Sequence, residues 1–170
     1  VSNKNKLDVL IEYFEKYKID VYSTGGTYRH IKKKTKKINL FEISKSSNFS
    51  EMLNGRVKTL QPFIHAGILA DRNNPTHLKQ LKKLNFNIFD LVVVNLYPFL
   101  DEIKKVNAKF NNCIDQIDIG GPTMIRASAK NYLNTVILTD PSQYENFINL
   151  AETKKNSVSL DFRKYLAGEA

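Results

Sequence analysis

The sequence has little of the features that mark several protein classes. It holds one cysteine, Cys113, which cannot form a disulfide within the chain, and three histidines. Cysteine and histidine show no metal-site spacing. No apolar run approaches the roughly 20 residues of a membrane-spanning helix, and no secretory signal stands out. We therefore expect a cytoplasmic protein with no metal site and no membrane partner.

What the sequence does contain is typical of one globular domain. Its 170 residues are 42% apolar and 25% charged, and the formal net charge is +9. The densest basic run, at residues 32–37, has no interleaved aromatic residues and no nucleic-acid motif around it. We therefore expect a solvated surface there and no nucleic-acid partner, although the positive potential would help to attract a phosphorylated anion.

Helical and strand patterns alternate along the chain, which predicts an α/β fold with a parallel sheet. Apolar residues at helical spacing mark helices at 4–17, 28–34, 76–84 and 141–150. Short apolar runs mark strands at 19–22, 40–43, 89–95 and 135–139, and residues 64–69 fit a strand or a turn. The polar run 152–157 predicts a linker, and residues 158–170 fit an amphipathic helix. In such a fold, ligands bind beyond the carboxyl ends of the strands.

The first candidate loop, Ser23-Thr24-Gly25-Gly26-Thr27, follows the first predicted strand. Glycine lets a ligand come close to backbone N–H groups. A helix that starts at Thr27 or Tyr28 would add its own free N–H groups, and the hydroxyl groups could donate further hydrogen bonds. A phosphate site and a plain strand-to-helix turn with Thr27 as the N-cap fit this loop equally well.

Two later loops offer other chemistry. Asn95 and Tyr97 lie where the strand at 89–95 ends, and their amide and phenol could bind a planar polar group or simply close a half-buried strand. Asp118 precedes two glycines and Pro122, which fits the first position of a helix. Asp118 could accept a proton, hold a ligand or cap that helix.

A further segment has no clear secondary structure but carries two cations. Arg56 and Lys58 are two residues apart, so in an extended chain their side chains point the same way. Together they suit a phosphorylated substrate, whereas each one alone is more often a solvated surface charge.

Six motifs occur in an order that is typical of one family: STGGT at 23–27, GRVKTL at 55–60, HAGIL at 65–69, NLYPF at 95–99, DIGGPT at 118–123 and AKN at 129–131. In these motifs the chain resembles the IMP cyclohydrolase domain of the bifunctional AICAR transformylase/IMP cyclohydrolase of purine biosynthesis. The resemblance runs from Ser2 to about Tyr144. It implies a methylglyoxal-synthase-like domain at 1–151, three layers with a central, mostly parallel sheet flanked by helices. Residues 152–170 would be a linker and the start of a connector to a transformylase domain.

The resemblance also implies a reaction. The substrate would be the formylated aminoimidazole carboxamide ribotide, FAICAR. Its carboxamide nitrogen attacks its formyl carbon, the ring closes, water leaves, and inosine monophosphate (IMP) results. The family uses neither a metal nor an organic cofactor for this step. Its full-length members also carry AICAR formyltransferase activity. The resemblance further implies a homodimer.

Site roles follow for the matching positions. The resemblance places the substrate 5′-phosphate among Ser2, Lys4, Ser23, Thr24, Gly25, Gly26 and Thr27. Further substrate contacts would come from Arg56, Thr59, Asn95, Ile119, Gly120 and Gly121. Asn95 and Tyr97 would hold the heterocyclic base of the substrate. The catalytic set is Lys58, Tyr97, Asp118 and Lys130. We expect Asp118 to accept the carboxamide proton, Lys58 and nearby backbone N–H groups to stabilise the oxyanion, and Tyr97 and Lys130 to assist proton transfer.

Two positions depart from the family pattern. Gln61 stands where histidine is usual and cannot shuttle a proton near pH 7, and Asn3 stands where aspartate is usual. Lys130 raises a geometric question, because in a straight helix from Pro122 it lies ~12 Å from the end near Asp118, at 1.5 Å per residue.

Two other interpretations stay open. A regulatory domain of the same fold could bind a nucleotide without turning it over, but it would not need Lys58, Tyr97 and Asp118. Methylglyoxal synthase is the third interpretation, and its expected acidic and histidine-containing motifs are not found in the sequence.

Overall fold

The computed structural model describes residues 1–47 and 49–170. The helices are α1 (Leu7–Lys16), α2 (Gly25–Lys34), α3 (Ile43–Ser46), α4 (Pro62–Leu69), α5 (Pro75–Leu84), α6 (Phe99–Ile103), α7 (Phe110–Asp115), α8 (Gly120–Lys130), α9 (Tyr144–Thr153) and α10 (Leu160–Glu169). The strands are β1 (Val21–Ser23), β2 (Leu40–Glu42), β3 (Leu91–Val93) and β4 (Val136–Leu138), and the 3-10 helices are η1 (Leu53–Gly55) and η2 (Pro141–Gln143). Helices and strands alternate, so the predicted α/β class is confirmed.

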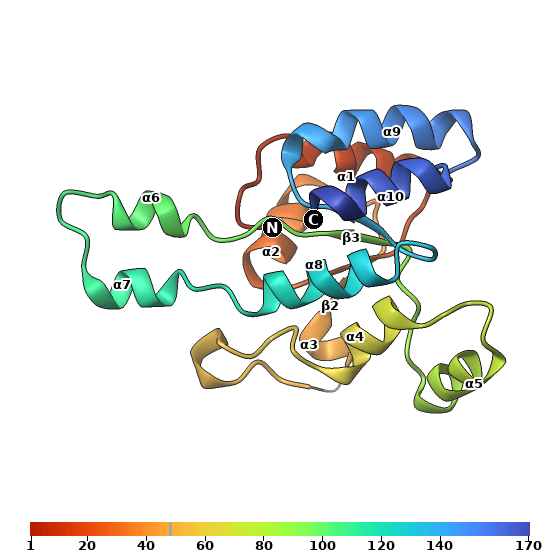
Figure 1. The fold of residues 1–170 in the computed structure, drawn as a ribbon, viewed down its shortest axis with the longest axis horizontal. Helices are drawn as coiled ribbons and strands as arrows, with labels where there is room; N and C mark the ends of the chain where they lie inside the picture. Colours follow the sequence, from red (N-terminus) through yellow and green to blue (C-terminus); the bar gives the residue numbers. More distant parts are fainter. Residues whose placement is uncertain (48) are drawn as a thin grey trace.

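The described strands pair in parallel. β1 pairs with β2, with Tyr22 opposite Phe41, and β3 pairs with β4, with Val92 opposite Ile137. Each pair forms a two-stranded sheet. Figure 1 shows α1 and α9 on one side of the strands and α3 and α4 on the other. This arrangement agrees with the predicted three layers.

The core lies where these layers meet. Leu10 of α1, Leu138 of β4 and Tyr144 of α9 are fully buried at 0% exposure. The buried residues of α1 are Leu7, Leu10, Ile11, Tyr13 and Phe14, which is the helical spacing seen in the sequence. This apolar face packs against α9. The described helices include none that is long and apolar enough to cross a bilayer.

One predicted element is wrong. Residues 64–69 belong to helix α4 and form neither a strand nor a turn. Pro62 occupies a first-turn position, where its fixed φ suits a helix and its missing N–H costs nothing. The buried residues Phe63, Ile64, Gly67 and Ile68 recur at helical spacing, and α4 packs against α8. A short run that is mostly apolar hides this period.

Two helices begin earlier than predicted. α2 starts at Gly25, with Thr24 as its N-cap, and α8 starts at Gly120, so Pro122 is the third helical residue. In both helices the glycines lie inside the first turn. Because this turn has free N–H groups, the glycines of α2 expose backbone donors, whereas in α8 the Gly121 N–H donates to the Asp118 carboxylate.

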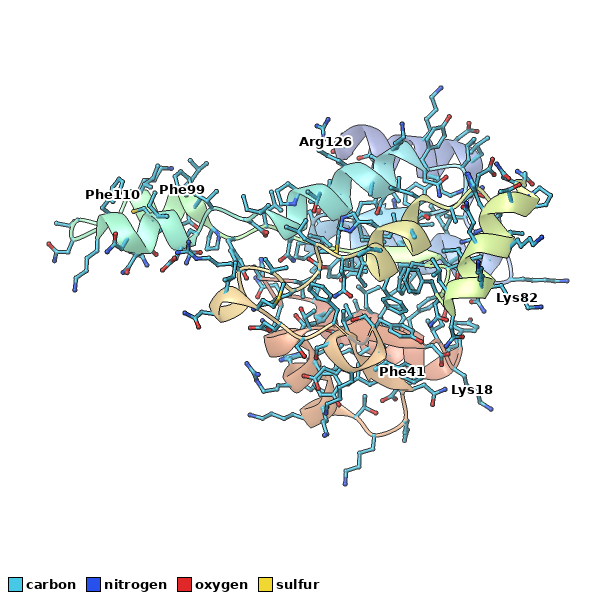
Figure 2. The ribbon with its side chains drawn as sticks, turned by 90° about the horizontal axis from the view of Figure 1, so that it is seen from below. Lys18, Phe41, Lys82, Phe99, Phe110 and Arg126 are labelled. Carbon is cyan, nitrogen blue, oxygen red and sulfur yellow. The ribbon has the colours of Figure 1, made fainter. Side chains whose placement is uncertain are left out.

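Helices α6 and α7 form an arm that the sequence did not predict. Figure 1 shows the arm reaching away from the rest of the molecule, and Figure 2 labels Phe99 and Phe110 on it. Val106, at the tip, is 101% exposed, and Phe110 is 78% exposed. Helices of this length are unstable in isolation in water. Because α6 and α7 have no buried residues, their sequences show no apolar period that would predict them.

The C-terminal residues pack on the domain. Leu166 of α10 is 1% exposed, and α10 contacts both β4 and α8. In the polar run 152–157, the Asn156 side-chain oxygen accepts a hydrogen bond from the Tyr13 hydroxyl at 3.2 Å. The division at residue 152 into a domain and a linker stays a prediction.

Candidate active site

A cavity of about 1850 Å³ runs between the two sheets and collects the candidate residues. It is larger than a typical ligand site of roughly 300–1,000 Å³, because it continues along the strands to the end opposite the candidate loops, where Arg72 and Arg163 line it. The predicted site residues that line the cavity are Ser2, Lys4, Ser23, Thr24, Gly25, Gly26, Thr27, Arg56, Lys58, Thr59, Asn95, Tyr97, Asp118, Ile119, Gly120 and Gly121.

The first loop places backbone donors at the cavity wall. The first N–H groups of a helix have no intrahelical acceptor, and among the described residues no side chain caps the start of α2. Gly25 has a φ of +43°, a conformation that glycine adopts at little cost. A Cβ on Gly26 would meet nothing within 4 Å. The start of α2 therefore has room for an anion close to the backbone.

The two cations of the second segment do not share one counter-charge. Arg56 pairs with Asp115 of α7, with 3.2 Å between the guanidinium and the carboxylate. Lys58 pairs with Glu51, with 3.6 Å between Nζ and Oε1. Both cations line the cavity, but each has its own carboxylate, so an incoming anion would compete with Glu51 and Asp115.

A tight turn produces the pairing of Lys58 with Glu51. Met52 and Val57 form an antiparallel bridge, which brings the residues on either side of it together. A Cβ on Gly55 would lie 2.7 Å from the Glu51 carboxylate and 2.8 Å from Cε of Lys58. Both side chains therefore lie directly over this glycine. The Asn-Gly pair before Arg56 is a turn signal that could have predicted this contact.

Gln61 supports the backbone next to Lys58. It is 4% exposed, and its Nε2 donates a hydrogen bond to the Lys58 carbonyl at 2.6 Å. Its Oε1 is buried without a hydrogen-bond partner among the described residues. The Gln61 side chain therefore holds the backbone of this loop in place.

Asp118 caps helix α8. Its Oδ1 accepts a hydrogen bond from the backbone N–H of Gly121 at 2.8 Å. Its Oδ2 lies over the same glycine, where a Cβ would come within 2.5 Å. A Cβ on Gly120 would likewise come within 2.5 Å of Thr59 Oγ1. The two glycines therefore let the second and third candidate segments approach each other closely.

Tyr97 lies at the base of the arm. It is 44% exposed, and it lines both the main cavity and a smaller one of about 280 Å³. Asp118 lines the same two cavities. Tyr97 and Asp118 therefore face a common region where the arm joins the domain.

Asn95 makes contacts that the sequence did not predict. Its Oδ1 accepts a hydrogen bond from the backbone N–H of Asn3, and its Nδ2 donates one to the Asn3 carbonyl, both at 2.8 Å. Tyr144 lies beside the Asn95 side chain, and burial raises the pKa of this phenol to about 12. Neither Asn3 nor Tyr144 carried a pattern that suggested this contact.

Lys130 is the one predicted site residue that does not line the main cavity. It is the last residue of α8, which runs unbroken for 11 residues from Gly120. A helix of that length spans roughly 16 Å at 1.5 Å per residue. The structure therefore separates Lys130 from Asp118, and the catalytic role of Lys130 stays a prediction.

Comparison with known proteins places this architecture. The family model described as "MGS-like domain" matches residues 7–123. The chain belongs to the MGS-like domain family. The matched residues contain the cavity-lining loops between Ser23 and Thr123 and end inside α8, whereas Ser2 and Lys4 lie before the match. The predicted recognition of the fold family is confirmed.

Two curated relatives of the chain share one name. The "Bifunctional purine biosynthesis protein PurH" of Clostridium botulinum strain Hall is 46% identical over 170 residues, and that of Clostridium acetobutylicum is 45% identical over 169 residues. Each match covers 99% of this chain and 33% of the relative. This MGS-like domain therefore spans one third of the length of these relatives.

A solved structure has the same fold. The "Crystal structure of ForH" matches with a TM-score of 0.83 and 29% sequence identity. The match covers 99% of this MGS-like domain and 86% of ForH. This agreement extends over α10 and the other C-terminal residues.

Proposed function

We propose that this MGS-like domain is an IMP cyclohydrolase, which cyclises FAICAR to IMP with loss of water. The observation that carries the proposal is the shared cavity, where the Gly25-Gly26 loop, Lys58, Tyr97 and Asp118 come together from four separate segments. The name of these curated relatives, which assigns them to purine biosynthesis, supports the same conclusion.

The reaction asks three things of the site. Nucleophile and electrophile are in one molecule, so the site must hold the carboxamide nitrogen against the formyl carbon in a near-attack arrangement. It must stabilise the negative charge that develops on the formyl oxygen. It must also move protons, because an amide nitrogen is a poor nucleophile and hydroxide is a poor leaving group.

The start of α2 suits the phosphate end of the substrate. Its free N–H groups and the open space at Gly26 accept an anion without a steric clash. Lys4 lines the same cavity and adds a positive charge. A phosphate held there would anchor the ribotide and leave its heterocycle to reach Lys58, Tyr97 and Asp118.

Asp118 suits the role of base because its two oxygens have separate tasks. Oδ1 accepts the N–H of Gly121, which fixes the carboxylate, and Oδ2 is left to take the carboxamide proton. Lys58 would exchange Glu51 for the developing oxyanion, and Tyr97 would assist proton transfer to the leaving water.

A direct assay tests the proposal. The purified chain is incubated with FAICAR, and IMP formation is followed over time. We expect turnover without added metal or cofactor. A folded sample that forms no IMP would contradict the cyclohydrolase assignment.

A nucleotide-binding domain without catalysis is the second candidate. The specific observation in its favour is that the reactive groups are engaged, since Asp118 caps α8 and Lys58 pairs with Glu51. This candidate predicts that IMP raises the melting temperature while FAICAR is not consumed. The two outcomes of the assay therefore separate the candidates.

The cellular setting is part of the proposal. We expect the domain to act in the cytoplasm, as a homodimer, on FAICAR and IMP and not on nucleic acid. Light scattering of the purified chain tests the dimer, and a monomeric mass at micromolar concentration would count against it.

A further inference from the structure

The segment of residues 1–5, which contains two predicted phosphate contacts, has no regular secondary structure. Ser2 and Lys4 are partly exposed, so burial alone does not fix them. Short segments without regular secondary structure open readily unless hydrogen bonds or packing hold them. What holds this segment therefore decides whether Ser2 and Lys4 are in place when an anion arrives.

The Leu7 N–H at the start of α1 donates to the Lys4 carbonyl at 3.1 Å, and two side chains also tie the segment to the domain. Thr27 Oγ1 donates a hydrogen bond to the Val1 carbonyl at 3.1 Å. Asn95 makes the second contact, with hydrogen bonds to both backbone groups of Asn3. Because Ser2 lies between Val1 and Asn3, and Lys4 directly follows Asn3, the Asn95 contact lies next to both predicted phosphate contacts.

The geometry at Asn95 allows one assignment of its amide. A backbone N–H can only donate, and a backbone carbonyl can only accept. Oδ1 must therefore face the Asn3 N–H and Nδ2 the Asn3 carbonyl, both at 2.8 Å. The side chain pairs with Asn3 as a neighbouring strand would, and so joins the segment to the end of β3.

The position of Asn95 is itself fixed. The N–H of Val94, the residue before it, donates to the Leu138 carbonyl at 2.9 Å, which extends the pairing of β3 with β4. Tyr144 is 0% exposed, and its phenol lies beside the Asn95 amide. Asn95 therefore transmits the position of the core strands to the segment of residues 1–5.

We propose that Asn95 is a positioning residue, which docks Asn3 and thereby places Ser2 and Lys4 around the anionic end of the ligand. This inference rests on the proposed function for its kinetic consequence. The positioning role differs from the predicted role of Asn95, which is a contact to the heterocyclic base of the substrate. An interaction made only in the transition state affects kcat, whereas one made equally in the ground state affects KM, and we expect the phosphate contacts to be of the second kind.

Amide exchange tests the docking without any turnover. In the ¹⁵N-labelled chain, the Asn3 amide should exchange about tenfold faster in Asn95→Ala than in the wild type, because its acceptor is lost. The Asn5 amide is the internal control, since it donates to the side chain of Asn3 and should not change. An unchanged Asn3 exchange rate would overturn the proposal.

Matched variants separate docking from unfolding. Asn3→Asp keeps the backbone groups that pair with Asn95 and keeps an acceptor for the Asn5 amide, so its Asn3-position exchange should match the wild type. Asn95→Asp keeps the acceptor for the Asn3 N–H but loses the donor, and it should give an intermediate exchange rate. If Asn95→Ala fails to fold, Asn95→Asp still decides.

Inorganic phosphate is the probe for the anion site. In the wild type, phosphate should shift the amide signals of Ser2, Lys4 and Gly26 together. In Asn95→Ala, the Gly26 shift should remain while the Ser2 and Lys4 shifts are lost. Shifts that stay coupled in the variant would contradict a positioning role.

Kinetics with FAICAR complete the test. For Asn95→Ala we expect KM to rise about tenfold with kcat within about twofold of the wild type. A fall in kcat at unchanged KM would place Asn95 on the heterocycle and overturn the proposal. If the wild type itself forms no IMP, the proposed function fails, but exchange and phosphate titration still decide the role of Asn95.

Discussion

The Asp118 carboxylate accepts the backbone N–H of Gly121, with 2.8 Å between Oδ1 and N. This single contact joins fold and proposed chemistry, because a helix cap and a candidate base are the same side chain. The cap fixes the orientation of the carboxylate, and the acceptor Oδ1 is not the oxygen that would take the proton. The two roles can therefore be separated by mutation.

Asp118→Asn should remove the base and keep the cap. Asparagine still offers a side-chain oxygen to the Gly121 N–H, so the melting temperature should stay within ~2 °C of the wild type. The rate constant kcat for IMP formation should fall ~100-fold or more, because an amide does not accept the proton. Steady-state kinetics and thermal unfolding measure the two effects.

Asp118→Ala is the matched control, which loses both roles. It should show the same loss of kcat and also a lower stability, by about 1 kcal/mol for a lost cap. An unchanged kcat in either variant would remove Asp118 from catalysis.

The sequence predicted the helices and strands that combine a clear period with a clear boundary. α1 shows five buried residues at helical spacing, and β3 lies within the Leu/Val run that suited a buried strand. α4 was missed because its residues are mostly apolar and give little period, and α6 and α7 because exposed helices bury no face. An apolar period appears in the sequence only where one side of a helix or strand is buried and the other side is exposed.

The sequence predicted which loops line the candidate site, but not which residues contact one another there. The rule that ligands bind at the carboxyl ends of strands pointed to the loops of Gly26 and Asn95, which line one cavity with Asp118, although Asp118 follows α7 and not a strand. The partners of these residues could not be read from the sequence. Asn3 and Asn95 are 92 positions apart, and such a pairing depends on the packed fold.

Gly26→Ala should weaken anion binding without a cost in stability. The added Cβ meets nothing within 4 Å, so the melting temperature should be unchanged or slightly higher. A methyl group at the start of α2 would occupy the space that a phosphate needs, and KM for FAICAR should rise at least fivefold, a value typical of one lost backbone contact. Unchanged KM would show that the phosphate does not approach Gly26.

Lys130→Met should leave catalysis nearly intact, because Lys130 lies at the far end of α8 and outside the main cavity. We expect kcat within about threefold of the wild type. Lys58→Met is the comparison, and it should lower kcat ~100-fold by removing the cation next to the developing oxyanion. Equal losses in both variants would mean that Lys130 reaches a site by another route, such as a neighbouring subunit.

Gly67→Ala should destabilise the fold. The new Cβ would lie 2.3 Å from the Asn87 carbonyl oxygen and 2.7 Å from the Phe89 ring, and α4 could relieve this clash only by moving away from that segment. We expect a loss of about 2–3 kcal/mol in the free energy of unfolding, measured by urea titration. Gly168→Ala in α10 meets open space and should cost nothing, which separates the clash from the change of residue type.

Asp140 should make the stability of the wild type depend on pH. Its side chain caps η2 by accepting the Ser142 N–H at 2.8 Å, and the hydrogen bonds from Ser142 lower the pKa of the Asp140 carboxyl below its ordinary value. A carboxyl with a depressed pKa stabilises the fold fully above its unfolded pKa, and this contribution is lost as the pH falls through the folded pKa.

Asp140→Asn keeps an uncharged cap that does not titrate. The stability of the wild type relative to this variant should therefore be constant from pH 7 to about pH 5 and should decrease below about pH 4. Urea titrations of both proteins at intervals between pH 7 and pH 2.5 measure this difference, and a difference that does not change with pH would contradict the role of the charge.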